Sequence, residues 1–170
     1  MIDEKFEKIM QSNKGCAIII AGSDSDKKHI DKVAESLAEY GIPYTKRICS
    51  AHKQPEKLIE IITDFNKTKE LITYIAIAGG TDALSGTLSF NIFGPVISCP
   101  PDAPNQSCLT NPPGSSNAYI QNPKNVGKFI AQMYAGINLN YRELLSRKNN
   151  EKIESLLNAD IKFQREYKGE

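Results

Sequence analysis

Four short apolar runs recur along the first part of the chain, and each is nearly continuous in Ile, Val and other apolar residues. Such runs are typical of strands that are buried on both faces of a parallel sheet. They cover residues 16–22, 44–50, 72–80 and 95–101. A weaker run at 117–121 predicts a fifth strand.

The segments between these runs have helical periodicity. In residues 25–41 the apolar positions recur every three or four residues, and Gly41 predicts the end of that helix. Residues 55–65 and 122–137 repeat the pattern, and each places a proline in its first turn. Because strands alternate with helices, we expect right-handed βαβ crossovers. The predicted fold is a single-domain α/β three-layer sandwich, in which a parallel, flavodoxin-like sheet has helices on both faces.

The chain divides into three predicted parts. Residues 1–14 form an N-terminal helical extension, residues 15–139 the α/β domain, and residues 140–170 a C-terminal helical arm. The arm is highly charged and its apolar residues are sparse. One interpretation is a solvated helix docked on its own domain. The other is an arm for subunit packing, which would contact a neighbouring copy.

Composition narrows the class of protein. The formal net charge of the 170 residues is +1, so there is no electrostatic case for a nucleic-acid or membrane partner. No apolar run approaches the roughly 20 residues of a membrane span, and the first residues lack a signal-peptide core. The four cysteines lack CxxC spacing, and three of them lie in or beside apolar runs. We therefore expect reduced thiols in a cytoplasmic protein, with no metal site.

Three polar loops follow predicted strands, where parallel sheets bind their ligands. They are "GSDSD" (22–26), "SAHK" (50–53) and "AGGTDALSG" (78–86). The proline-rich segment 95–104 is interpreted mainly as a rigid connection.

The first loop has the chemistry of a phosphate cradle. Gly22 permits close backbone approach, and Ser23 and Ser25 offer hydroxyl groups beside a helix N-terminus. A carboxylate facing a phosphate would repel it, so Asp26 should turn toward a sugar hydroxyl or an amine. The alternative is an ordinary Ser/Asp helix cap.

The second loop contains one of the chain's two histidines. His52 is a candidate proton shuttle near neutral pH, and Lys53 a candidate phosphate counter-charge. The alternative is a solvated loop histidine. His29 lies in a helical segment among lysines, and we expect it to be a surface residue.

In the third loop, Gly79 and Gly80 would let the backbone approach a flat ring. The alternative is a glycine-rich turn in which Thr81 or Asp82 caps the helix that follows.

Taken in order, these loops and the segments "PVISCPP" and "NPPGSSNAYIQNPKNVGKFIAQMYA" resemble the PurE family of purine biosynthesis over about residues 15–139. That family carboxylates 5-aminoimidazole ribonucleotide. Its carboxylase class uses carbon dioxide directly and carries "SAHK", "ALSG" and "CPP"; its mutase class carries "SAHR". Lys53 and the segments 83–86 and 98–101 match the carboxylase class. Gly80 and Asp82 depart from it, since that class has arginine and asparagine there.

The resemblance implies roles for single residues. Ser23 and Ser25 would hold the phosphate with help from Lys53, Asp26 would bind the ribose, and His52 would be the general acid–base. The full set of substrate-binding residues that we expect is Gly22, Ser23, Ser25, Asp26, Ser50, Ala51, Lys53, Ala78, Gly79, Gly80, Thr81 and Leu84.

The resemblance also implies an octamer with sites at subunit interfaces, and no cofactor. The expected reaction converts 5-aminoimidazole ribonucleotide and carbon dioxide to the 4-carboxy product without ATP or biotin. The alternatives are a mutase acting on the N5-carboxyamino isomer, a non-catalytic nucleotide-binding homologue, and a related domain in another cofactor pathway.

Overall fold

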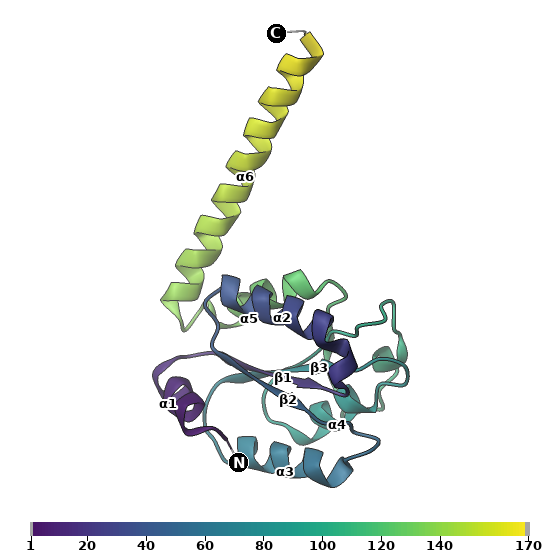
Figure 1. The fold of residues 1–170 in the computed structure, drawn as a ribbon. Coiled ribbons are helices and arrows are strands. Elements are labelled where there is room, and N and C mark those ends of the chain that lie inside the picture. Colours follow the sequence, from purple (N-terminus) through teal and green to yellow (C-terminus); the bar gives the residue numbers. More distant parts are fainter. Residues whose placement is uncertain (1, 169–170) are drawn as a thin grey trace.

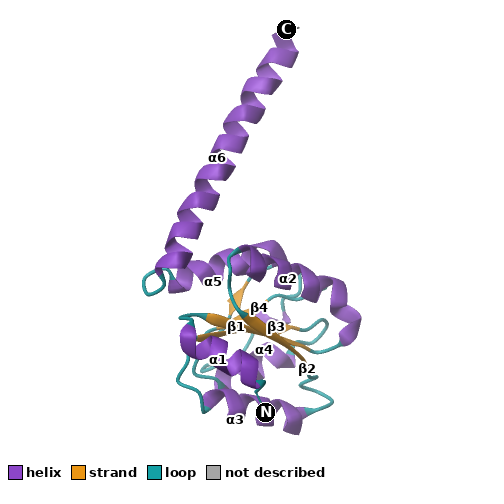
Figure 2. Ribbon diagram, turned by 60° about the vertical axis from the view of Figure 1, so that its left-hand side comes forward, coloured by secondary structure: helices purple, strands orange, loops and turns teal. Residues whose placement is uncertain are grey.

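Five parallel strands form one sheet with the order β2-β1-β3-β4-β5 (Figures 1 and 2). The structure is a computed structural model that describes residues 2–168. The strands are β1 (Cys16–Ala21), β2 (Tyr44–Ile48), β3 (Ile72–Ile77), β4 (Val96–Ser98) and β5 (Ala118–Tyr119). This is the flavodoxin-like strand order, so the predicted fold class is confirmed.

Helices cover both faces of the sheet (Figure 1). The helices are α1 (Glu4–Ser12), α2 (Lys27–Glu39), α3 (Pro55–Asn66), α4 (Ala83–Asn91), α5 (Val126–Tyr134) and α6 (Leu139–Lys168). Three short 3₁₀ turns join them, η1 (Asp24–Asp26), η2 (Ser107–Leu109) and η3 (Pro123–Asn125). One core lies between the sheet and the pair α2 and α5, and a second between the sheet and α1, α3 and α4.

Side-chain alternation along β1 explains why both faces need cover. Ile19 belongs to the core under α2 and α5, whereas Ile18 and Ile20 belong to the opposite core, and all three are fully buried. A strand that is apolar on both faces is stable only between two layers of helices.

The second strand differs from its prediction. β2 lies at the sheet edge, where Lys46 is exposed and Ile48 is 51% exposed. The expectation of a strand buried on both faces was therefore wrong for β2. An edge strand pairs on one side only and keeps charged residues that discourage further pairing.

The turn residues behave as predicted. Gly41 has a φ of 61°, the left-handed conformation that ends α2, and Pro55 occupies the first turn of α3. Asn122 accepts a hydrogen bond from the backbone of Lys124 and so caps η3, which leads into α5.

The N-terminal helix is part of the α/β unit. Phe6 and Met10 of α1 are buried in the same core as α3 and α4. Asp3 caps the helix by accepting a hydrogen bond of 3.0 Å from the backbone N–H of Phe6.

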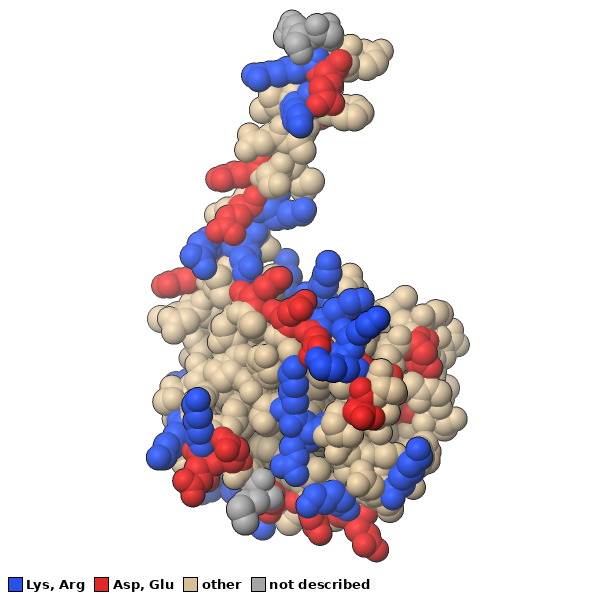
Figure 3. Space-filling view, viewed as in Figure 1, with Lys and Arg blue, Asp and Glu red and all other residues tan. Residues whose placement is uncertain are grey.

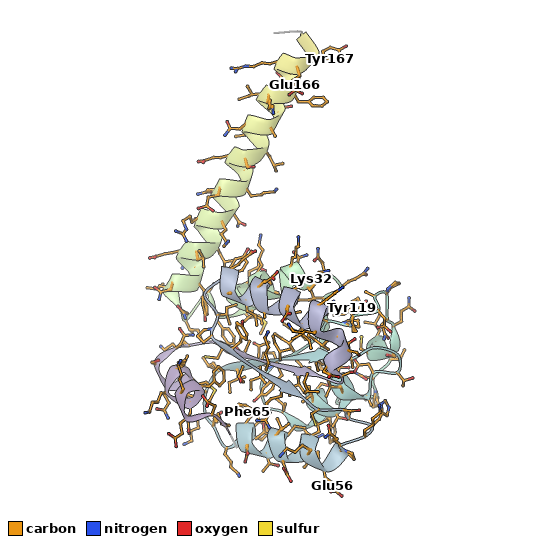
Figure 4. The ribbon with its side chains drawn as sticks, in the orientation of Figure 1. Lys32, Glu56, Phe65, Tyr119, Glu166 and Tyr167 are labelled. Atoms are coloured by element: carbon orange, nitrogen blue, oxygen red, sulfur yellow. The ribbon has the colours of Figure 1, made fainter. Side chains whose placement is uncertain are left out.

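The last helix is anchored only at its base. Tyr141 is buried, and its hydroxyl donates a hydrogen bond of 2.6 Å to the carbonyl of Gly15. Leu144 and Leu145 pack against the core. From residue 149 to residue 167 every side chain is exposed, and the helix projects away from the body (Figures 1 and 4). The interpretation of a helix docked on its own domain therefore holds only for the first turns of α6.

All four cysteines are free and buried, as expected for the three in or beside apolar runs. Within residues 2–168, none of the helices combines the length and the apolar character that crossing a bilayer would require.

Candidate active site

A cavity of about 290 Å³ opens at the carboxyl ends of β1 and β3, where the strand order reverses. It is lined by the three polar loops that the sequence singled out. Every predicted site residue lines it except Lys53 and Gly80, and Ala83 lines it without having been predicted. The volume is at the small end of the roughly 300–1,000 Å³ of ligand pockets.

The first loop is organised by its two serines. The backbone N–H of Ser25 donates a hydrogen bond of 3.1 Å to Oγ of Ser23, and the two hydroxyls lie 2.8 Å apart. Ser23 therefore caps η1, as the helix-cap interpretation expects, and it also lines the cavity. Asp26 precedes α2 but makes no side-chain cap bond to it, and it is one of the residues that line the cavity.

The second loop is a tight turn that presents His52. The backbone N–H of Gln54 donates to the carbonyl of Ser50 at 2.8 Å, and that of Lys53 donates to Oγ of Ser50 at 3.3 Å. His52 is exposed at the cavity and is the one imidazole among its lining residues. Lys53 is exposed beside the cavity rather than in its wall.

The third loop turns its carboxylate inward. Asp82 is buried and caps α4, because its Oδ1 accepts a hydrogen bond of 2.9 Å from the backbone of Ser85. Its Oδ2 accepts one of 3.0 Å from the hydroxyl of Ser98. Thr81 and Ala83 line the cavity but Asp82 does not. The added negative charge is therefore satisfied by the protein and does not face a ligand.

Residues 102–107 hold this third loop in place, a role that the sequence interpretation missed. The backbone N–H of Gly80 donates a hydrogen bond of 2.8 Å to Oδ2 of Asp102, and its carbonyl accepts one of 2.8 Å from Nδ2 of Asn105. The Gly80 N–H, and then the Asn105 amide, hold the pKa of the Asp102 carboxyl below its ordinary value. Only the clustering of polar residues after Pro101 hinted at this contact.

His29 is not the solvated surface residue that the sequence suggested. Its ring is half buried, and Nε2 lies 3.0 Å from the carbonyl oxygen of Cys99 at the end of β4. Burial lowers the pKa of His29, and Lys32 adds to that shift. Burial also raises the pKa of the Cys99 thiol to about 12, which disfavours the thiolate form.

Across residues 2–168, no group of three or more His, Cys, Asp and Glu side chains is placed to hold a metal ion. A larger groove, of about 1310 Å³, runs between α1 and α3, but none of the predicted site residues lines it. Charges of both signs are interspersed along α6 and over the body on the face shown in Figure 3.

A flavodoxin-like sheet with a polar cavity at its switch point is the arrangement in which α/β proteins commonly bind small ligands. Comparison with protein families then narrows this class. The family model described as "AIR carboxylase" matches residues 16–155. The chain belongs to the AIR carboxylase family, and the predicted resemblance is confirmed.

Individual relatives agree with this assignment. A phosphoribosylaminoimidazole carboxylase of Archaeoglobus fulgidus is 34% identical over 150 residues, which cover 85% of this chain and 82% of that protein. One of Treponema denticola is 36% identical over 124 residues, which cover 69% of this chain and 78% of that protein. A bifunctional carboxylase and succinocarboxamide synthetase of Rattus norvegicus is 31% identical over 96% of this chain, which spans 40% of that longer protein.

The fold agrees as well. The crystal structure of Treponema denticola PurE superposes with a TM-score of 0.82 at 30% identity, covering 88% of this chain and 99% of that one.

Proposed function

We propose that this chain carboxylates 5-aminoimidazole ribonucleotide with carbon dioxide, giving the 4-carboxy product in de novo purine biosynthesis. The observation that carries the proposal is the cavity itself, which gathers His52, two serine hydroxyls and a glycine-rich wall at one sheet edge. Family membership supports the substrate class, since the relatives are named for this carboxylation.

The chemistry asks little of the protein. The aminoimidazole ring is an enamine, so its ring carbon is nucleophilic and attacks carbon dioxide without ATP or biotin. A carbon–carbon bond forms, one oxygen of carbon dioxide takes the electron pair, and the ring carbon then loses its proton. The protein must hold the ring, exclude water and accept that proton.

Each part of the cavity then has a role. His52 accepts the proton as the general base. Ser23 and Ser25 hold the phosphate with Lys53, and Asp26 binds the ribose hydroxyls. The rest of the site surrounds the flat ring and consists of Gly22, Ser50, Ala51, Ala78, Gly79, Gly80, Thr81 and Leu84.

The competing assignment is a mutase that acts on the N5-carboxyamino isomer. Lys53, residues 83–86 and residues 98–101 favour the carboxylase. Incubating the purified protein with each substrate separately, without ATP, tests the choice. We expect product from 5-aminoimidazole ribonucleotide and bicarbonate. Product from the isomer alone would assign the mutase, and binding without product from either would assign a non-catalytic homologue.

We further propose that the active form is a homo-oligomer, an octamer, in which α6 packs on neighbouring subunits. Among residues 2–168, no lysine or arginine lines the cavity of the single chain, whereas phosphates are commonly bound by cationic side chains. Completion of the site by Lys53 and by a neighbouring subunit is consistent with this composition. The apolar side chains exposed along α6 also support a packed arm.

A further inference from the structure

The third loop has no side chain at two successive positions, Gly79, which lines the cavity, and Gly80, which links it to Thr81 in the same wall. Gly80 has a φ of 65°, in the left-handed region that other residues adopt at a cost. A Cβ added at Gly80 would meet nothing within 4 Å. Neither glycine has a side chain that could hold this stretch of backbone in position.

The hydrogen-bond partners of Gly80 come from one segment, residues 102–107. Asp102 accepts the N–H of Gly80 at 2.8 Å, and Asn105 donates to the Gly80 carbonyl at 2.8 Å. The hydroxyl of Ser107 accepts the N–H of Asp82 at 2.9 Å. A single segment therefore provides hydrogen-bond partners for the N–H and the carbonyl of Gly80 and for the N–H of Asp82.

The segment is also cross-linked within itself. Nδ2 of Asn105 donates a hydrogen bond of 3.0 Å to Oδ1 of Asp102, and Oδ1 of Asn105 accepts one of 3.0 Å from the backbone of Ser107. Asn105 is 8% exposed. Asp102 therefore receives two hydrogen bonds that fix the direction of its carboxylate.

The same carboxylate fills the space beside Gly79. A Cβ added at Gly79 would lie 3.3 Å from the carboxyl carbon of Asp102. Asp102 therefore limits the movement of Gly79 by contact and the orientation of Gly80 by a charge-assisted hydrogen bond.

We propose that Asp102 is a positioning residue. It acts through the N–H of Gly80 to hold the backbone wall Gly79–Thr81 at the distance that a flat heteroaromatic ring requires. This inference rests on the proposed function, because that wall is where the aminoimidazole ring would lie. Asp102 touches no reacting atom, so its effect falls on binding of the ring rather than on proton transfer.

Three variants test the inference. Asp102→Ala removes both acceptor oxygens, whereas Asp102→Asn keeps one oxygen that can accept the Gly80 N–H. Glu60→Ala is the matched control, since this carboxylate lies exposed on α3 away from the cavity, with Lys57 as its hydrogen-bond partner. The measurements are kcat and KM for 5-aminoimidazole ribonucleotide, its Kd by calorimetry, and Tm.

For Asp102→Ala we expect KM and Kd to rise about tenfold while kcat stays within about threefold, which is the signature of lost binding. Asp102→Asn should fall between the wild type and Asp102→Ala, and Glu60→Ala should match the wild type. The Tm of each variant should stay within about 4 °C of the wild type.

Unchanged KM and Kd in Asp102→Ala would overturn the inference. So would equal losses in kcat and in Tm for both Asp102 variants, which would assign a general structural role. If the wild type binds the nucleotide but does not turn it over, the proposed function fails while the Kd comparison still decides the role of Asp102. Absence of binding by the wild type would overturn both.

Discussion

The hydroxyl of Ser98 at the end of β4 donates a hydrogen bond of 3.0 Å to Oδ2 of Asp82, in the loop after β3. Ser98 is fully buried and Asp82 is 5% exposed. The other carboxylate oxygen caps α4 through the N–H of Ser85. This pair joins two neighbouring strand ends, and it turns the Asp82 carboxylate away from the cavity, which Asp82 does not line.

Asp82→Ala should destabilise the fold by about 3 kcal/mol. The variant loses the cap of α4, worth about 1 kcal/mol, and leaves the buried Ser98 hydroxyl without its partner, which costs about 1–3 kcal/mol. Asp82→Asn keeps an oxygen for the cap and should lose less than about 1.5 kcal/mol. Urea unfolding of both variants measures the difference. Equal losses in the two variants would contradict the structural role given to this carboxylate.

The half-buried His29 predicts a pH dependence of stability. Its folded-state pKa lies below the ordinary value of 6.5, first because of burial and also because Lys32 is near, while the Cys99 carbonyl and Asp26 oppose the shift. The unfolded chain therefore binds a proton more readily than the folded one. The contribution of His29 is fully present above pH 6.5 and is lost as the pH falls through the folded-state pKa.

Measuring Tm from pH 7.5 down to pH 5.5 tests this, with His29→Gln as the comparison. Glutamine offers an amide N–H to the Cys99 carbonyl but does not titrate. We expect the wild type to lose more Tm over this range than His29→Gln. Parallel curves would show that His29 does not contribute to the pH dependence of Tm. Because both proteins retain His52, any difference between the curves comes from position 29.

The apolar face of α6 predicts an assembly. Ile153, Leu156 and Leu157 recur at helical spacing and are 56%, 57% and 59% exposed. Leu156→Glu with Leu157→Glu should lower the mass seen by light scattering, because each buried leucine contributes about 2 kcal/mol to an interface. The body should remain folded, since both side chains are exposed and belong to neither core.

Lys162→Ala, on the opposite side of α6, is the matched control and should keep the wild-type mass. A wild type that is monomeric at micromolar concentration, or a double variant with unchanged mass, would refute the packed arm.

The fold was largely readable from the sequence, because strands buried between two helical layers need continuous apolar runs. β1 and β3 fit that rule. β2 did not, since its position at the edge depends on strand order, which the composition of the run does not record. The end of α2 at Gly41 and the start of α3 at Pro55 were also predictable, because glycine suits the left-handed conformation after a helix and proline suits the first helical turn.

The site was readable where polar residues directly follow a strand, as with Ser23, His52 and Thr81. It was not readable where a contact joins distant loops. The hydrogen bond between Gly80 and Asp102 spans 22 positions, and that between His29 and Cys99 spans 70. The local pattern does not identify the partner in either case, although the polar residues after Pro101 hinted that their segment makes a contact.

The central claim is that His52 moves the proton in a carboxylation at this cavity. The most direct measurement is the turnover of 5-aminoimidazole ribonucleotide with bicarbonate, without ATP, by the wild type and by His52→Asn, with nucleotide Kd measured alongside. We predict turnover by the wild type, a loss of at least about 100-fold in His52→Asn, and a Kd that changes less than about threefold. Near-normal turnover by His52→Asn would contradict the account.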